Sequence, residues 1–342
     1  MKKKVGCIVV CCIMVMFLFA CGNHQEYTMD KVHIGVVYYN HSDTFLVALL
    51  NSFKEELKGL EDGTHETTVM IRDAASSQRT QNDQVKEMID AGCNVLCVNL
   101  VDRADPSEII DLARDHNVPI IFFNREPVVE DMMQWDRLYY VGADAKQSGI
   151  LQGEIAADVI KRKKADRNQD GKIQYVVMEG EAGHQDAIIR TENAVKTLKE
   201  KGIELEKLSC QIANWNRAQA QNRMGQMISR YQNKIELVLS NNDDMALGAI
   251  DAYKKLNYTE NNLPLFFGVD GTEVGLKAIK DLSLSGTIYN DKEGQAEAMA
   301  KLAVAVVTKK GMDKMKFKNE KYIYSSYYKV TSDNVDDFLN KK

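Results

Sequence analysis

The chain has 342 residues, of which 44% are apolar and 27% are charged, an ordinary balance for a globular protein with more than one domain. Its formal net charge is −5, and loss of the first 20 residues would leave 41 basic and 49 acidic side chains, a net charge of −8. Nucleic-acid binding requires basic patches, so this acidic balance excludes nucleic acid as the main partner.

The chain begins with a predicted targeting segment. Three lysines at 2–4 precede an uncharged run at 5–20, which is short for a membrane-spanning helix and typical of a signal peptide. The run ends in Leu-Phe-Ala-Cys, which resembles a bacterial lipobox. That resemblance implies cleavage before Cys21, a lipid on its sulfur and a lipidated tether at 21–31. The alternative is an uncleaved anchor helix, and both interpretations place the rest of the chain outside the cytoplasm.

Strands and helices alternate after the tether. Continuous apolar runs predict buried strands at 32–39, 67–71, 95–99 and 118–123, with helices between them at 45–60, 81–91 and 108–117. Apolar strands that alternate with helices are typical of a parallel sheet covered on both faces.

The same alternation restarts in the second half. The predicted strands are 139–142, 173–178, 237–240, 265–269 and 286–289, and the predicted helices are 144–162, 185–201, 246–256, 272–280 and 293–309. About ten strand-helix units are too many for one eight-fold barrel, so the pattern predicts two open sheets.

Three cysteines remain in the mature chain beyond Cys21. Cys93 and Cys97 flank a predicted strand, and Cys210 lies far along the chain. We predict that all three are small buried apolar side chains, because no metal-binding or redox spacing is present.

The stretch at 183–190 joins a strand to a helix and carries three functional groups. Asp186 and Arg190 are four residues apart and share one helix face, and His184 lies at the start of the helix. Open α/β sheets bind ligands at such edges. The alternative is an ordinary surface ion pair with a capping side chain. Polar residues follow other strand ends as well, where Asx-turns and caps are a further explanation: Asn99, Asn124, Asn242, Asp270 and Asn290.

The segment at 166–174 has the pattern of a calcium loop. Oxygen-bearing side chains stand at positions 1, 3 and 5, a glycine stands at position 6, and positions 7 and 9 are Lys172 and Gln174. Position 12 is Val177 and not the usual glutamate, so the remaining ligand has to come from elsewhere. The alternative is a polar surface turn.

Taken together, these motifs resemble the periplasmic glucose/galactose-binding proteins of bacterial ABC sugar importers. The resemblance implies two Rossmann-like, doubly wound α/β lobes of parallel sheet joined by a three-segment hinge, the type I periplasmic binding protein fold. The first lobe would be 32–142 plus 291–325, and the second 143–290 plus 326–342 with the calcium loop. The matching segments are 34–36, 81–84, 118–124, 139–142, 183–186, 240–243 and 267–270.

The family's ligand contacts carry over onto matching positions. Gln185 replaces a usual proline and Asn216 a usual aspartate, and neither is a direct contact. The implied calcium ligands are Asp166, Asn168, Asp170, the Lys172 carbonyl, Gln174 and a distant Glu236. The implied sugar contacts are Asp43, Phe45, Asn124, His184, Asp186, Arg190, Trp215, Asn242, Asp270 and Asn290.

The chemistry of these residues suits a sugar. Phe45 and Trp215 match the apolar faces of a pyranose ring, although both could instead be core aromatics. Charged and amide side chains match its hydroxyls, and a missing hydroxyl would leave a buried group unpaired.

The resemblance implies a monomeric lipoprotein that binds D-glucose or D-galactose and delivers it to the permease and ATPase subunits of an ABC importer. It also implies a chemoreceptor as a further partner of the closed form. The alternative within this class is another monosaccharide, such as ribose, xylose or a related furanose.

Two other classes fit the residues less well. A glycosidase would use Asp43, Asp186 or Asp270, but Arg190 is expected to lower the pKa of Asp186, and no nucleophile motif is present. The sequence therefore predicts a protein that is not an enzyme. A sugar-responsive repressor would need a helix-turn-helix before Val32, where the targeting segment stands.

Overall fold

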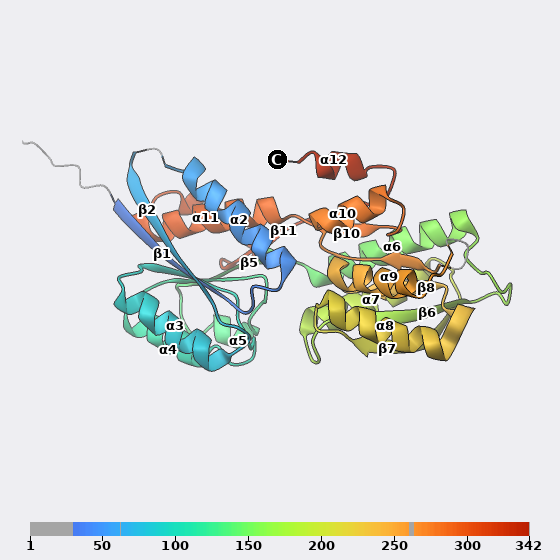
Figure 1. Ribbon diagram of the computed structural model, residues 1–342. Coiled ribbons are helices and arrows are strands. Elements are labelled where there is room, and N and C mark those ends of the chain that lie inside the picture. Colours follow the sequence, from blue (N-terminus) through green and yellow to red (C-terminus); the bar gives the residue numbers. More distant parts are fainter. Residues whose placement is uncertain (1–29, 62, 260–262, 342) are drawn as a thin grey trace, which may run out of the picture.

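The computed structural model describes residues 30–61, 63–259 and 263–341 (Figure 1). The predicted signal peptide, the lipidation site at Cys21 and most of the tether lie outside these ranges. Within them, the search for a helix long and apolar enough to cross a membrane finds no candidate.

The first lobe is built on six parallel strands in the order β11-β5-β4-β3-β1-β2. Its central strands β3 and β4 are buried throughout, because both faces of the sheet are covered. The bounds are β1 Asp30–Tyr38, β2 His65–Asp73, β3 Val95–Val98, β4 Ile120–Phe123, β5 Leu138–Ala143 and β11 Tyr322–Ser325.

Helices cover both faces of this sheet. Alternate residues of one strand enter different cores: Cys97 packs in the core beneath α2 and α11, and Leu96 packs in the core of α3 and α4. Figure 1 shows α2 and α11 above the sheet and α3 and α4 below it. The bounds are α2 Thr44–Gly59, α3 Gln78–Asp90, α4 Ser107–Asp115, α5 Val129–Met132, α11 Lys292–Thr308 and the 3₁₀ turn η3 Met312–Lys314.

The second lobe contains a parallel sheet in the order β7-β6-β8-β9. An antiparallel pair, β10 with β12, adjoins it through bridges from Phe267 to Gly286 and from Asp270 to Tyr289. The two bridges are parallel, and the added strand β12 runs antiparallel to β10 because the chain returns there from the first lobe. The bounds are β6 Ile173–Glu179, β7 Leu205–Ile212, β8 Leu237–Ser240, β9 Leu265–Phe267, β10 Thr287–Asn290 and β12 Tyr327–Val330.

The helices of the second lobe again form two layers. Val177 of β6 packs in the core of α6 and α7, and Val176 packs in the core of α8 and α9. The bounds are α6 Ala145–Lys163, α7 Gln185–Glu200, α8 Arg217–Tyr231, η1 Gln232–Lys234, α9 Asp243–Lys255, α10 Glu273–Lys280 and α12 Val335–Leu339.

The chain passes between the two sheets three times. It leaves the first lobe after β5 and enters α6, returns from β10 into α11, and leaves again between β11 and β12. The two sheets are therefore joined by three separate segments.

The sequence pattern did not indicate the strands β7, β11 and β12 or the helices α5, α8 and α12. β7 lies at a sheet edge and is half-buried for most of its length, so its side chains lack the apolar run of a buried strand. Cys210 lies on this strand and is only partly buried, so the prediction of a buried side chain is wrong there, whereas Cys93 and Cys97 are buried as expected.

Close packing of α6 on α7 positions the helix that carries His184, Asp186 and Arg190. A Cβ added at Gly149 would lie 2.6 Å from the carbonyl oxygen of Arg190, and one added at Gly153 would lie 2.7 Å from that of Ala194. Two glycines on α6 therefore allow the two helix backbones to approach.

We expect Gly149→Ala to destabilise the protein by about 2 kcal/mol, because the added methyl group forces α6 away from α7. Gly225→Ala in α8 is the matched control, since a Cβ there meets nothing within 4 Å. The control should be neutral or more stable by up to about 1 kcal/mol, because alanine favours the helix. Chemical unfolding of both variants measures the difference, and equal stabilities would contradict this packing.

Candidate functional site

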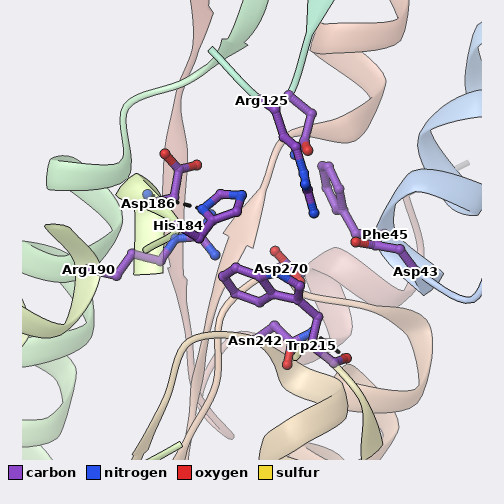
Figure 2. A pocket seen from close by; sticks show the side chains of 10 residues that line it. Asp43, Phe45, Arg125, His184, Asp186, Arg190, Trp215, Asn242 and Asp270 are labelled. Atoms are coloured by element: carbon purple, nitrogen blue, oxygen red, sulfur yellow. Dashed lines mark hydrogen bonds between the residues drawn. The ribbon is translucent and has the colours of Figure 1, made fainter. Parts of the chain in front are cut away.

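A pocket lies where the carboxyl ends of the two sheets face each other. Its lining side chains come from the segments that follow β1 and β4 in the first lobe and β6, β7, β8 and β9 in the second, including the N-terminal parts of α2 and α7 (Figure 2). This is the edge at which open parallel sheets bind ligands. The lining residues are Asp43, Phe45, Asn124, Arg125, His184, Asp186, Arg190, Trp215, Asn242 and Asp270.

Three of the lining residues are also helix N-caps. Asp43 caps α2 by accepting from the backbone N–H of Leu46 at 3.0 Å, and Asn242 caps α9 by accepting from Met245 at 2.9 Å. His184 caps α7. Capping fixes the start of each helix at the edge of the pocket.

Two aromatic rings enter the pocket from opposite lobes. Phe45 is buried at the start of α2, and Trp215 comes from the loop after β7. Trp215 has a left-handed backbone, with φ +59°. A Cβ at Gly180 would lie 2.1 Å from its ring, so only glycine leaves room for the indole there. The ring of His184 packs edge-on against the indole, with centroids 5.1 Å apart.

Arg190 is buried, and its guanidinium donates to three acceptors other than Asp186. Nε donates to Ser148 at 3.1 Å, one NH2 group to the carbonyl of Asn241 at 2.8 Å, and the other to the hydroxyl of Tyr327 at 3.0 Å. The alternative interpretation of this stretch, a surface ion pair with Asp186, is therefore wrong. Arg190 is committed to the interior, because a buried guanidinium requires partners for its donors.

Asp186 lines the pocket from the first turn of α7. Burial raises its pKa, and this outweighs the opposing effect of Arg190. The expected lowering of this pKa is thus also wrong. Burial likewise raises the pKa of Asp270, whose backbone adopts a positive φ of +109°. Both carboxyls are poorly hydrated and lack a full set of partners.

His184 is neutral in this setting. Burial, with the nearby charges of Arg125 and Arg190, lowers the pKa of its imidazole to about 2. Its Nδ1 accepts from the backbone N–H of Asp186 at 3.2 Å, so the proton resides on Nε2. The ring therefore presents a hydrogen-bond donor on its outer side.

Arg125 lines the pocket and was not predicted, because a charged residue just past a strand end usually faces water. Its guanidinium stacks on Tyr39, 3.7 Å from the ring centroid, and donates to the carbonyl of Val101 at 2.8 Å. Figure 2 shows it descending between His184 and Phe45. The signal available in the sequence was its position directly after Asn124, itself at a strand end.

Asn290 is the one predicted sugar contact that does not line the pocket. It is buried between the lobes, where its side-chain oxygen accepts from Gln295 at 2.6 Å. The other nine predicted contacts all line it. Asn99, a further polar residue at a strand end, donates to Phe123 and Asn124 and supports the loop from behind.

Hydrogen bonds from backbone N–H groups to side-chain oxygens stabilise the loop that resembles a calcium site. Asp166 accepts from the backbone N–H groups of Asp170 and Gly171, at 3.2 and 2.9 Å. Glu236 lies buried beneath the loop and accepts from the N–H groups of Arg167 at 2.6 Å and Gln174 at 3.2 Å. The residues are therefore gathered as predicted from the two distant segments.

The donor set suits calcium, which prefers carboxylate, amide and carbonyl oxygens. Asn168 and Gln174 both hydrogen-bond to the same carboxylate oxygen of Asp170, at 3.0 and 2.7 Å, so these side chains converge. In the part of the chain that the structure describes, no group of three or more His, Cys, Asp or Glu side chains is arranged to hold a metal ion.

Comparison with known proteins identifies the fold. A family model described as a periplasmic binding protein domain matches residues 34–311. The D-galactose/methyl-galactoside binding periplasmic protein MglB of Haemophilus influenzae is 34% identical over 329 residues, which are 95% of this chain and 97% of that protein. The chain belongs to the periplasmic binding protein family. The predicted fold class is thereby confirmed.

Other members of the periplasmic binding protein family are similar over comparable lengths. The xylitol-binding protein of Mycolicibacterium smegmatis is 28% identical over 338 residues, covering 98% of this chain and 87% of that protein. The crystal structure of an ABC transporter solute binding protein from Bacillus halodurans, with bound myo-inositol, has a TM-score of 0.75 at 27% identity. It covers 91% of this chain and 98% of that one.

These relatives are solute-binding proteins and not enzymes, as the sequence analysis predicted for this chain. The protein is therefore a periplasmic binding protein, and the family places it outside the cytoplasm.

Proposed function

We propose that the pocket binds D-galactose or D-glucose and that the closed protein delivers the sugar to the permease of an ABC importer. The observation that carries this proposal is the pairing of two aromatic rings, Phe45 and Trp215, with a rim of hydroxyl-binding groups. Aromatic faces suit the C–H faces of a pyranose, and carboxylates, amides and a guanidinium suit its hydroxyls. The similarity to a D-galactose-binding relative over 95% of the chain supports the same ligand class.

The charges of the pocket favour an uncharged ligand. Two guanidiniums, from Arg125 and Arg190, stand among the carboxyls of Asp43, Asp186 and Asp270. The carboxyls thus outnumber the guanidiniums before any ligand enters. A sugar acid would add a further negative charge to this buried site, which is costly.

The competing ligands are other neutral polyols. Relatives bind xylitol and myo-inositol, and these share the hydroxyl pattern of a sugar without its ring oxygen. The nine lining residues carried over from the glucose/galactose-binding resemblance favour a hexose over these and over ribose or xylose.

Tryptophan fluorescence tests this proposal. Titration of the chain from residue 22 onward with galactose or glucose should change the emission and saturate, because Trp215 stacks on the sugar. Ribose, xylose, xylitol and myo-inositol should bind at least about tenfold more weakly, since one unmatched buried hydroxyl partner costs about 1–3 kcal/mol.

Two tryptophan variants show which tryptophan produces the fluorescence change. Trp135→Phe should keep the response, because Trp135 lies outside the pocket, whereas Trp215→Phe should abolish it and weaken binding about tenfold. Tight binding of myo-inositol or a pentose with no response to either hexose would overturn the hexose assignment.

We also propose that the loop at 166–174 binds a structural Ca²⁺. The predicted ligands are Asp166, Asn168, Asp170, Gln174, the carbonyl of Lys172 and Glu236. The support is the convergence of side chains on Asp170 and the burial of Glu236 beneath the loop. The ion would stabilise the loop against the second lobe and lies apart from the pocket residues.

Calcium should raise the melting temperature if this is correct. A ligand at a hundredfold excess over its dissociation constant stabilises by about 2.7 kcal/mol, which corresponds to about 5 °C for a protein of this size. We expect that shift between calcium and chelator in the wild type, and none in Asp166→Asn/Asp170→Asn. An equal melting temperature with calcium and with chelator would overturn the proposal.

We further propose that Cys21 carries a lipid that attaches the mature protein to the outer face of a membrane. The support is the Leu-Phe-Ala-Cys ending of the apolar run. The wild-type chain should fractionate with membranes and Cys21→Ser should be released, because a lipid on the Cys21 sulfur holds the protein there. Recovery of both in the same fraction would contradict lipidation.

A further inference from the structure

The lobes touch across the cleft through side chains that do not depend on a ligand. Thr44 at the start of α2 donates to the carboxylate of Asp244 in α9 at 2.8 Å. On another side of the pocket, Arg125 after β4 reaches Glu181 after β6. Each contact joins one lobe to the other, so each can form only when the cleft is closed.

The contact between Arg125 and Glu181 has the geometry of a strong ion pair. One guanidinium nitrogen lies 3.0 and 2.9 Å from the two carboxylate oxygens. The side chain of Arg125 is 6% exposed and that of Glu181 is 32% exposed, so water screens the pair only in part.

Arg125 is held in place by its own lobe before it meets Glu181. The guanidinium stacks on Tyr39 and donates to the carbonyl of Val101, and both of these residues belong to the first lobe. The guanidinium is therefore preorganised, and little side-chain entropy is lost when the second lobe brings up Glu181.

We propose that Arg125 and Glu181 form a latch that stabilises the closed form, so that this pair sets ligand affinity without setting ligand preference. The inference rests on the proposed function, in that closure follows binding in the cleft. Glu181 does not line the pocket, so its effect reaches the ligand only through Arg125 and through the position of the second lobe.

We expect the loss of this ion pair to change the dissociation constants of all ligands by the same factor. Apparent affinity scales with the fraction of protein in the binding-competent closed form, whatever the ligand. Removal of the Glu181 carboxylate, which does not line the pocket, should therefore raise the dissociation constant by the same factor for galactose and for glucose. A residue that contacts the sugar directly would instead alter the ratio between the two epimers.

The second lobe supplies a matched control. Arg217 and Asp251 form a pair with similar contacts, 2.7 and 3.1 Å, and Asp251 is 29% exposed, close to the exposure of Glu181. Both residues lie in one lobe, so this pair cannot respond to closure.

The first measurement is a titration of wild type, Glu181→Ala, Arg125→Met, the double variant and Asp251→Ala with galactose and glucose. We expect Glu181→Ala to raise both dissociation constants about tenfold and to leave their ratio unchanged. The double variant should equal Arg125→Met within about twofold, because the pair acts as a unit. Asp251→Ala should match wild type.

The second measurement needs no ligand. Thr44→Cys/Asp244→Cys places two thiols where side chains already touch in the closed form, so oxidation traps each transient closure of the empty protein. Adding Glu181→Ala to this pair should slow trapping about tenfold, and adding Asp251→Ala should not.

The outcomes separate the two proposals. If no hexose binds but Glu181→Ala slows trapping, the hexose assignment fails and the latch stands. If Glu181→Ala leaves both the dissociation constants and the trapping rate unchanged, the latch is overturned. If Glu181→Ala shifts the galactose-to-glucose ratio, the pair acts on ligand preference and the proposal is wrong.

Discussion

The buried guanidinium of Arg190 holds together the parts of the second lobe that surround the pocket. Its three hydrogen bonds reach Ser148 in α6, Asn241 after β8 and Tyr327 in β12, while the residue itself belongs to α7. Four elements from distant parts of the sequence are thus fixed by one planar side chain. The glycines of α6 make this reach feasible, because they let α7 approach closely. A neutral replacement would leave three acceptors without a donor in the interior.

A consequence of this arrangement is that the pocket is polar and poorly hydrated at once. Burial raises the pKa of Asp186 and of Asp270 and lowers that of His184. These shifts have a common cause, since each charged form loses water without gaining a full set of partners. A ligand with hydroxyls around its rim supplies the missing partners. Selectivity then follows from the number of hydroxyls that match, because every unmatched group stays costly.

The sequence predicted the buried strands correctly, because a strand covered on both faces has a continuous run of apolar residues. The short strands β3 and β4 are apolar on both faces, and their run of side chains predicted a covered parallel sheet. β7 escaped notice because an edge strand of partly exposed residues carries no such run. The antiparallel pairing of β10 with β12 depends on the return of the chain from the first lobe, which local pattern does not encode.

The site was predictable to a similar extent. Strand-end polar residues and the family resemblance placed nine of the ten contacts on the pocket. Asn290 lies outside the pocket lining, and its side-chain oxygen accepts from Gln295 on the following helix. Arg125 was missed, and the pKa of Asp186 was predicted to shift in the wrong direction, because helix spacing shows which side chains are near each other and not which partners compete for them. Tyr327 and Ser148 were the competitors, and both are remote in sequence.

The double duty of Asp43, His184 and Asn242 constrains how this binding protein can diverge. Each side chain that faces the ligand also caps the helix on which it stands. A replacement that suits a new ligand but cannot cap removes about 1 kcal/mol of stability together with the old preference. At these three positions, evolution toward other sugars is therefore limited to residues that can also cap a helix. Other replacements require earlier mutations elsewhere that raise the stability of the protein. The aromatic position Phe45, which caps nothing, is a freer route to a new ligand.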